Sequence, residues 1–86
     1  MKEITMFVLD SCPYCKQAYR YMKELTKENP EYAKLDIRII DEEKYPDIAE
    51  RYDYYYVPAY YANQLKLHEG IPQKDIIRDI FERALK

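Results

Sequence analysis

The chain has 86 residues, which is the size of one domain built around a single modest core. Hydrophobic residues make up 48% of it, and this content favours a folded chain over a disordered one. Its 14 basic and 16 acidic residues leave a formal charge of −2, without a basic block that would attract nucleic acid or anionic lipid.

The sequence shows neither a secretory signal nor a membrane span. Residues 1–9 lack the charged start, long apolar region and small-residue cleavage site of a signal peptide. No apolar run approaches the roughly 20 residues that cross a bilayer. We therefore expect a cytoplasmic monomer with one domain over residues 1–86, and no nucleic-acid or membrane partner.

The first third of the chain predicts a strand followed by a helix. Residues 4–9 (Ile-Thr-Met-Phe-Val-Leu) are apolar and partly β-branched, which indicates a strand buried on both faces. From Pro13 to Leu25, apolar residues recur at the spacing of an amphipathic helix, with charged residues on its other side. Pro30 disfavours helical geometry at the residue before it, so this helix should end near Glu28.

The middle of the chain predicts a second strand and a short helix. In residues 35–40, Leu35, Ile37 and Ile39 alternate with polar residues, which is typical of a strand with one covered face. Strand, helix and strand then form a right-handed βαβ unit with a parallel pair. After a charged connection, a short helix is predicted over residues 46–52.

The last third predicts a hairpin and a final helix. Residues 57–62 and 64–68 flank a turn near Asn63 and form an antiparallel pair. Gly70 and Pro72 mark the exit from it, and an apolar stripe predicts a helix over residues 76–85. The order β-α-β-α-β-β-α predicts an α/β fold with one four-stranded mixed sheet flanked by helices.

Two cysteines three positions apart stand where the first strand meets the first helix. Cys12 and Cys15 form a C-x-x-C motif, which in this βα context indicates a redox-active dithiol. The unpaired N–H groups and the dipole of the first helical turn favour a thiolate at Cys12. Pro13 fits the first helical position, because the N–H that it lacks would have no partner there. We therefore expect the pair to switch between dithiol and disulfide.

Three other interpretations of the cysteines compete with redox chemistry. A static structural disulfide is unusual in a cytosolic protein, where disulfides are mostly catalytic or redox-sensing. A zinc site needs four ligands, and His68 is the one further Cys or His in the chain. Ordinary core cysteines would not account for the Pro-Tyr pair between them or for the start of a helix at this point.

Tyrosine is unusually frequent, with 11 residues, and five of these lie between Tyr54 and Tyr61. Platforms that stack nucleic-acid bases are accompanied by a positively charged groove, which this composition does not suggest. We therefore interpret these tyrosines as strand residues with apolar bodies and polar tips.

These motifs resemble those of a known family. The Cys12–Cys15 stretch reads Cys-Pro-Tyr-Cys, as in the dithiol motif of glutaredoxins, and Val57-Pro58 resembles the Val-Pro loop of that family. The element order resembles the thioredoxin fold along the whole chain. The resemblance implies that Cys12 is the attacking thiolate, that Cys15 is the resolving thiol and that Pro58 is a cis-proline facing them.

Three further residues are candidates for substrate contact. Tyr14 lies between the cysteines and shapes the surroundings of the thiol or faces solvent. An extended substrate segment can pair with the backbone of Val57 beside Pro58, in the manner of strand addition, since the proline itself has no N–H.

The chain departs from glutaredoxins where that family binds glutathione. The usual lysine before the first cysteine is missing from residues 9–11, and residues 68–73 (His-Glu-Gly-Ile-Pro-Gln) replace the usual Gly-Gly and Asp. Asp10 would repel an anion, and Lys74 alone adds little. We expect weak use of glutathione, no bound cofactor, and reduction mainly by a reductase of the thioredoxin-reductase kind.

The leading functional hypothesis is a small thiol–disulfide oxidoreductase that reduces protein or small-molecule disulfides through Cys12 and Cys15. The alternative is a thioredoxin-fold binding module that holds a metal or an iron–sulfur centre at a dimer interface. Two cysteines per chain would then need a second subunit or outside thiols to complete four ligands.

Overall fold

In the computed structural model, which describes all 86 residues, the apolar run at the start of the chain forms β1 (Ile4–Val8). All five of its residues are buried, as the sequence predicted. β1 is an inner strand of a four-stranded sheet with the order β2-β1-β3-β4, and a separate hydrophobic cluster covers each of its faces. β1 therefore fixes the position of whatever follows its carboxyl end.

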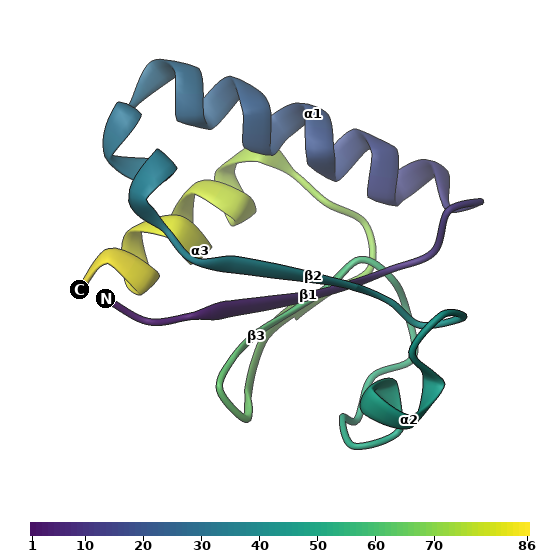
Figure 1. The fold of residues 1–86 in the computed structure, drawn as a ribbon. Helices are drawn as coiled ribbons and strands as arrows, with labels where there is room; N and C mark the ends of the chain where they lie inside the picture. Colours follow the sequence, from purple (N-terminus) through teal and green to yellow (C-terminus); the bar gives the residue numbers. More distant parts are fainter.

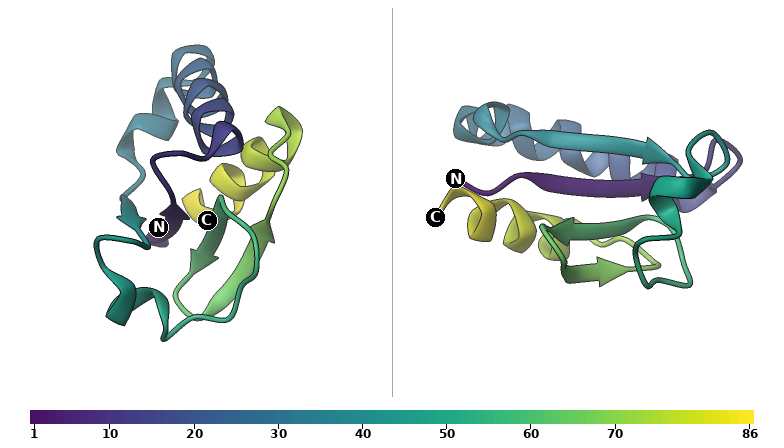
Figure 2. Two further views of the ribbon diagram at one scale, coloured as in Figure 1. Left: turned by 90° about the vertical axis from the view of Figure 1, so that its right-hand side faces the viewer. Right: turned by 60° about the horizontal axis from the view of Figure 1, so that its bottom comes forward.

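The observed order of elements confirms the predicted β-α-β-α-β-β-α fold with one mixed sheet. β1 pairs in parallel with β2 and antiparallel with β3, and β3 pairs antiparallel with β4 (Figure 2, right). No helix is long and apolar enough to cross a bilayer. After β1 the chain forms α1 (Pro13–Glu28), a 3₁₀ helix η1 (Pro30–Lys34), β2 (Ile37–Asp41), α2 (Pro46–Ala49), β3 (Ala59–Ala62), β4 (Leu65–Glu69) and α3 (Lys74–Leu85).

Two helices cover one face of the sheet and a small aromatic cluster covers the other. Figure 1 shows α1 and α3 side by side on one face, and α2 beyond the opposite face. The larger core lies under α1 and α3 and includes Met6, Tyr60 and Phe81. On the other face, the ring of Phe7 lies 4.8 Å from that of Tyr52 (centroid to centroid). The chain termini meet at the end of the sheet away from Cys12, where the Lys2 N–H donates to the Ala84 carbonyl.

The tyrosine-rich segment is only partly a strand, which corrects one expectation. Tyr60 and Tyr61 lie in β3 and are buried, as expected for strand residues. Tyr54 precedes the strand and stacks on Phe7 at 4.9 Å, while Tyr55 is 83% exposed. Because α2 is one turn long, tyrosine rings cover much of the sheet face that a longer helix would cover. Packing therefore explains Tyr54, Tyr60 and Tyr61, whereas Tyr55 and Tyr56 are exposed.

The second strand differs from its prediction in position and in pattern. β2 begins at Ile37, because Leu35 instead ends η1 with a hydrogen bond from its N–H to the Tyr32 carbonyl. Ile39 was predicted to face the core, yet it is 47% exposed, and Ile40 is buried on the Phe7 side. β2 is an edge strand that is partly covered on each face, so a simple alternation does not describe it.

Several further boundaries differ from the prediction, by one residue for β1 and β4 and by more elsewhere. η1 was not predicted, although Asn29 followed by Pro30 is a typical helix start, and the Asn29 side chain accepts from the Glu31 N–H at 3.1 Å. α2 ends at Ala49 rather than at residue 52, because the following N–H groups bond three residues back and tighten the turn. β3 begins at Ala59 rather than at residue 57. α1 ends at Glu28 as predicted.

Candidate functional site

The sulfur of Cys12 caps the first helix. Cys12 has an extended backbone (φ −85°, ψ 114°) immediately before α1, and Pro13 occupies the first helical position. The Cys15 N–H donates a hydrogen bond to the Cys12 Sγ at 3.2 Å. An N–H group and the positive end of the helix dipole both favour negative charge on this atom. The local geometry is therefore that of a thiolate-stabilising cap.

The second cysteine has a different environment. Cys15 is 1% exposed, whereas Cys12 is partly exposed, and both are free thiols. Burial, followed by the hydrogen bond with Cys12, raises the pKa of the Cys15 thiol to about 12. Cys15 therefore keeps its proton at neutral pH, beside a more accessible Cys12. The two cysteines thus differ in accessibility, while the attacking and resolving roles remain what the resemblance implied.

The Val57–Pro58 segment faces Cys12 from the other side of the site. The peptide bond between Val57 and Pro58 is cis, and Pro58 is fully buried. The Cys12 thiol donates to the Val57 carbonyl oxygen with a sulfur–oxygen distance of 3.6 Å. The Val57 N–H makes no hydrogen bond within the chain. The structure thus brings together residues that the sequence places far apart.

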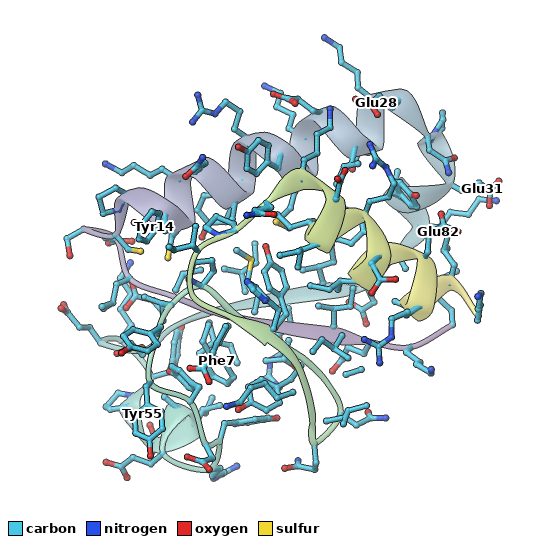
Figure 3. The ribbon with its side chains drawn as sticks, turned by 180° about the vertical axis from the view of Figure 1, so that it is seen from behind. Phe7, Tyr14, Glu28, Glu31, Tyr55 and Glu82 are labelled. Atoms are coloured by element: carbon cyan, nitrogen blue, oxygen red, sulfur yellow. The ribbon has the colours of Figure 1, made fainter.

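A groove of about 590 Å³ has Val57 in its wall, and the carbonyl oxygen of Val57 accepts from the Cys12 thiol. Val57 and Tyr14, which is 44% exposed, form part of its wall. Figure 3 shows Tyr14 at the amino-terminal end of α1, where it projects from the helix. Tyr56, Ile71 and Ile76 make much of the remaining lining apolar. The groove is therefore a surface on which an apolar or aromatic group can lie next to Cys12.

The lining of this groove contains neither lysine nor arginine. Lys74, the nearest candidate in the sequence, instead forms ion pairs with Glu24, at 3.1 Å, and with Glu28, both in α1. Asp10, which was expected to repel an anion, is exposed and lies 3.8 Å from the Lys44 ammonium. Cationic side chains that would hold the two carboxylates of a small thiol are thus absent from the groove wall or paired elsewhere.

Two residues of the groove were not recognised as site residues from the sequence. The Glu69 carboxylate accepts hydrogen bonds from the backbone N–H groups of Tyr55, at 2.7 Å, and Tyr56, at 3.0 Å. The Nε2–H of His68 donates to the Ile71 carbonyl at 3.0 Å and so holds the loop after β4. The Glu69 contacts have no sequence signal, because they join residues 13 and 14 positions apart, whereas the His68 contact is local.

Nothing in the single chain completes a metal site. No group of three His, Cys, Asp or Glu side chains gathers in the structure, so Cys12 and Cys15 are the only ligands that this site offers. A metal or cluster here would need further ligands from outside the chain.

Comparison with known proteins gives consistent matches to one group. Residues 2–82 match the family model described as "Thioredoxin domain". No curated protein sequence matches the chain. Among solved structures, an uncharacterised thioredoxin-like protein from Clostridium perfringens is 30% identical, with a TM-score of 0.71 over 98% of this chain and 71% of that one.

More distant structures share the fold. A mutant thioredoxin from Halobacterium salinarum is 20% identical, with a TM-score of 0.69 over 96% of this chain and 74% of the other. The oxidised thioredoxin from Plasmodium falciparum is 18% identical, with a TM-score of 0.67 over 93% and 77% of the two chains.

Proposed function

The chain belongs to the thioredoxin domain family, and from this premise we propose that it is a small thiol–disulfide oxidoreductase that uses Cys12 and Cys15 as its redox couple. The observation that carries the proposal is the asymmetry of the two thiols. A partly exposed Cys12 caps α1, and a buried Cys15 lies next to it with a pKa raised to about 12 by burial. Cys12 is suited to attack the substrate disulfide, and Cys15 is suited to resolve the mixed disulfide afterwards.

The proposed reaction has two exchange steps. The Cys12 thiolate attacks one sulfur of a substrate disulfide, which forms a mixed disulfide and releases the other substrate sulfur as a thiolate that takes up a proton. Cys15 then loses its proton and attacks the Cys12 sulfur. The Cys12–Cys15 disulfide forms and the second substrate thiol leaves. Two electrons pass from the protein to the substrate.

The arrangement of Val57 supports a peptide as substrate. Its carbonyl oxygen lies beside Cys12 and its N–H makes no hydrogen bond within the chain, so an extended segment next to a substrate cystine can pair with this backbone. The apolar wall formed by Tyr14, Tyr56 and Ile71 gives such a segment a surface to cover. We therefore propose protein disulfides as the main substrates, with small disulfides as secondary ones.

The same groove argues for a protein reductant. The Cys-Pro-Tyr-Cys motif is that of glutaredoxins, but the groove wall has no lysine or arginine to hold the carboxylates of glutathione. We propose that a reductase of the thioredoxin-reductase kind regenerates the dithiol and that glutathione does so poorly. A reducing compartment, the cytoplasm, suits a chain whose cysteines act as thiols.

Catalysed reduction of insulin by dithiothreitol tests the proposal. Wild-type protein should accelerate the precipitation of the insulin B chain, and Cys12→Ser should leave only the rate of dithiothreitol alone. With insulin and no dithiothreitol, Cys15→Ser should make the first attack and then accumulate as a mixed disulfide. A Cys12→Ser variant that is as active as the wild type would contradict the proposal.

A further inference from the structure

The last residue of β4 holds the segment that leads into the site. Glu69 pairs with Ala59 across the β3–β4 hairpin, so its backbone is fixed in the sheet. One carboxylate oxygen, Oε2, accepts from both the Tyr55 and the Tyr56 N–H groups, and the other accepts from the Lys66 ammonium at 2.6 Å. Two consecutive backbone donors immediately before Val57 are therefore held by one side chain.

Gly70, the residue after Glu69, fixes the backbone immediately after Val57. The Gly70 N–H donates to the Pro58 carbonyl at 3.0 Å. The residues on both sides of Val57 are therefore held by hydrogen bonds, those before it to Glu69 and the one after it to Gly70. Both sets of hydrogen bonds come from the carboxyl end of β4, which the sheet itself keeps in place.

Packing does little to hold the segment before Val57. The side chains of Tyr55 and Tyr56 are 83% and 68% exposed, so hydrogen bonds rather than burial determine its conformation. The hydrogen bond from Lys66, followed by those from the two backbone N–H groups, lowers the pKa of Glu69 to about 2. The acceptor is therefore a carboxylate throughout the neutral pH range.

We propose that Glu69 is a positioning residue for disulfide exchange: by holding the Tyr55 and Tyr56 N–H groups, it keeps the backbone of Val57 beside Cys12, where a peptide substrate pairs. This inference rests on the proposed function. It implies that Glu69 matters for substrates with a peptide backbone and much less for a small disulfide that only has to reach the Cys12 sulfur.

A merely structural role predicts a different result. If Glu69 only stabilised the fold, its loss would lower the melting temperature and leave the KM of the folded protein unchanged for every substrate. A positioning role instead raises the KM for a peptide disulfide, because a mobile Val57 segment must be ordered each time a substrate binds.

Three variants separate these roles. Glu69→Leu removes the acceptor and leaves two N–H groups unpaired. Glu69→Gln keeps an amide oxygen that can accept both N–H groups, so it tests rescue by a conservative change. Lys66→Met removes the ion pair alone. The two probes are a quenched fluorescent peptide disulfide and 5,5′-dithiobis(2-nitrobenzoic acid), which has no peptide backbone.

For the peptide disulfide, Glu69→Leu should raise the KM about tenfold with little change in kcat, since two hydrogen bonds that preorganise the segment are lost. Glu69→Gln and Lys66→Met should stay within about threefold of the wild type. The rate with 5,5′-dithiobis(2-nitrobenzoic acid) should change by less than about twofold in all three variants. A Glu69→Leu protein with the wild-type KM for the peptide, or with equal losses on both probes, would overturn the inference.

Amide hydrogen exchange in the wild-type protein gives an independent result if Glu69→Leu does not fold. The Tyr55 and Tyr56 amides should exchange much more slowly than expected for exposed loop residues, and Glu69→Gln should retain part of this protection. Unprotected amides in the wild type would overturn the inference. A wild-type protein that reduces neither probe would overturn the proposed function and the inference with it, whereas an active wild type with an unaffected Glu69→Leu variant would overturn only the inference.

Discussion

The carbonyl oxygen of Val57 lies 3.6 Å from the sulfur of Cys12, although 45 positions separate the two residues in the chain. The sheet topology produces this contact. β1 and β3 are antiparallel neighbours, and Phe7 near the end of β1 pairs with Ala59 at the start of β3. Whatever follows β1 must therefore meet whatever precedes β3, and those segments carry Cys12 and Val57.

We predict that the two thiols of the reduced protein differ in reactivity at neutral pH. Iodoacetamide should label Cys12 at least about tenfold faster than Cys15, because the thiolate is the reacting form and burial raises the pKa of Cys15 to about 12. Mass mapping of the labelled peptides after short exposure measures both rates. Unfolding the protein in urea before labelling should remove the difference, and a faster Cys15 in the folded protein would refute the assignment of roles.

The raised pKa of Cys15 also predicts a loss of stability in alkali. Its thiol loses a proton near pH 9 in the unfolded chain but only near pH 12 in the folded one. Between these values the unfolded state binds fewer protons, so the free energy of unfolding should fall as pH rises, by up to about 1.4 kcal/mol per pH unit.

Urea unfolding tests this prediction between pH 9 and pH 12. The free energy of unfolding is measured for the reduced wild type and for Cys15→Ala at increasing pH. The tyrosines and Cys12 are common to both proteins, so the difference between the two unfolding free energies isolates Cys15. This difference should shrink as pH rises. A difference that stays constant would show that burial does not perturb the thiol.

Much of the fold and the position of the thiols could be predicted from the sequence, because those features are local. The apolar run of β1, the Pro13 start of α1 and the stop before Pro30 are each determined by neighbouring residues, and the structure confirms them. The C-x-x-C motif could be interpreted for the same reason, since the strand, the helix cap and the helix around it are consecutive in the chain.

The remainder of the site depends on contacts that no local pattern encodes. Glu69 was a charged residue at the end of a hairpin strand, and only the folded hairpin brings it to the Tyr55 and Tyr56 N–H groups. Ile39 was predicted to be covered and is exposed, because the sequence does not state that β2 is an edge strand. Tertiary packing overrides alternation at such an edge.

Replacing Gly70 by alanine should destabilise the protein by about 1–3 kcal/mol, because a side chain strains the backbone at its φ of +92°. A Cβ atom there would lie 3.8 Å from the Cβ of Tyr56, which is ordinary contact, so the cost comes from the backbone. Urea unfolding measures the change. Asn63→Gly, at a residue with φ 55°, is the matched control and should stay within about 0.5 kcal/mol of the wild type.

The source of electrons is a further prediction. With one disulfide substrate, a thioredoxin-reductase system should support much faster NADPH oxidation than glutathione plus glutathione reductase, because Lys74 is held by Glu24 and Glu28. The double variant Glu24→Gln with Glu28→Gln frees Lys74 and should improve glutathione use by a small factor. Efficient, saturable turnover of the wild type with glutathione alone would contradict this prediction and show a glutathione-dependent protein.

The most direct test of a Cys12–Cys15 redox couple is a stoichiometric reaction followed by mass spectrometry. Reduced protein is mixed with one equivalent of a peptide disulfide, quenched in acid and mapped. We expect the protein to lose two hydrogen atoms and the new disulfide to join Cys12 to Cys15. One peptide disulfide should become two thiols for each protein molecule. A protein that stays a dithiol, or that ends as a stable mixed disulfide with Cys15 still free, would contradict this prediction.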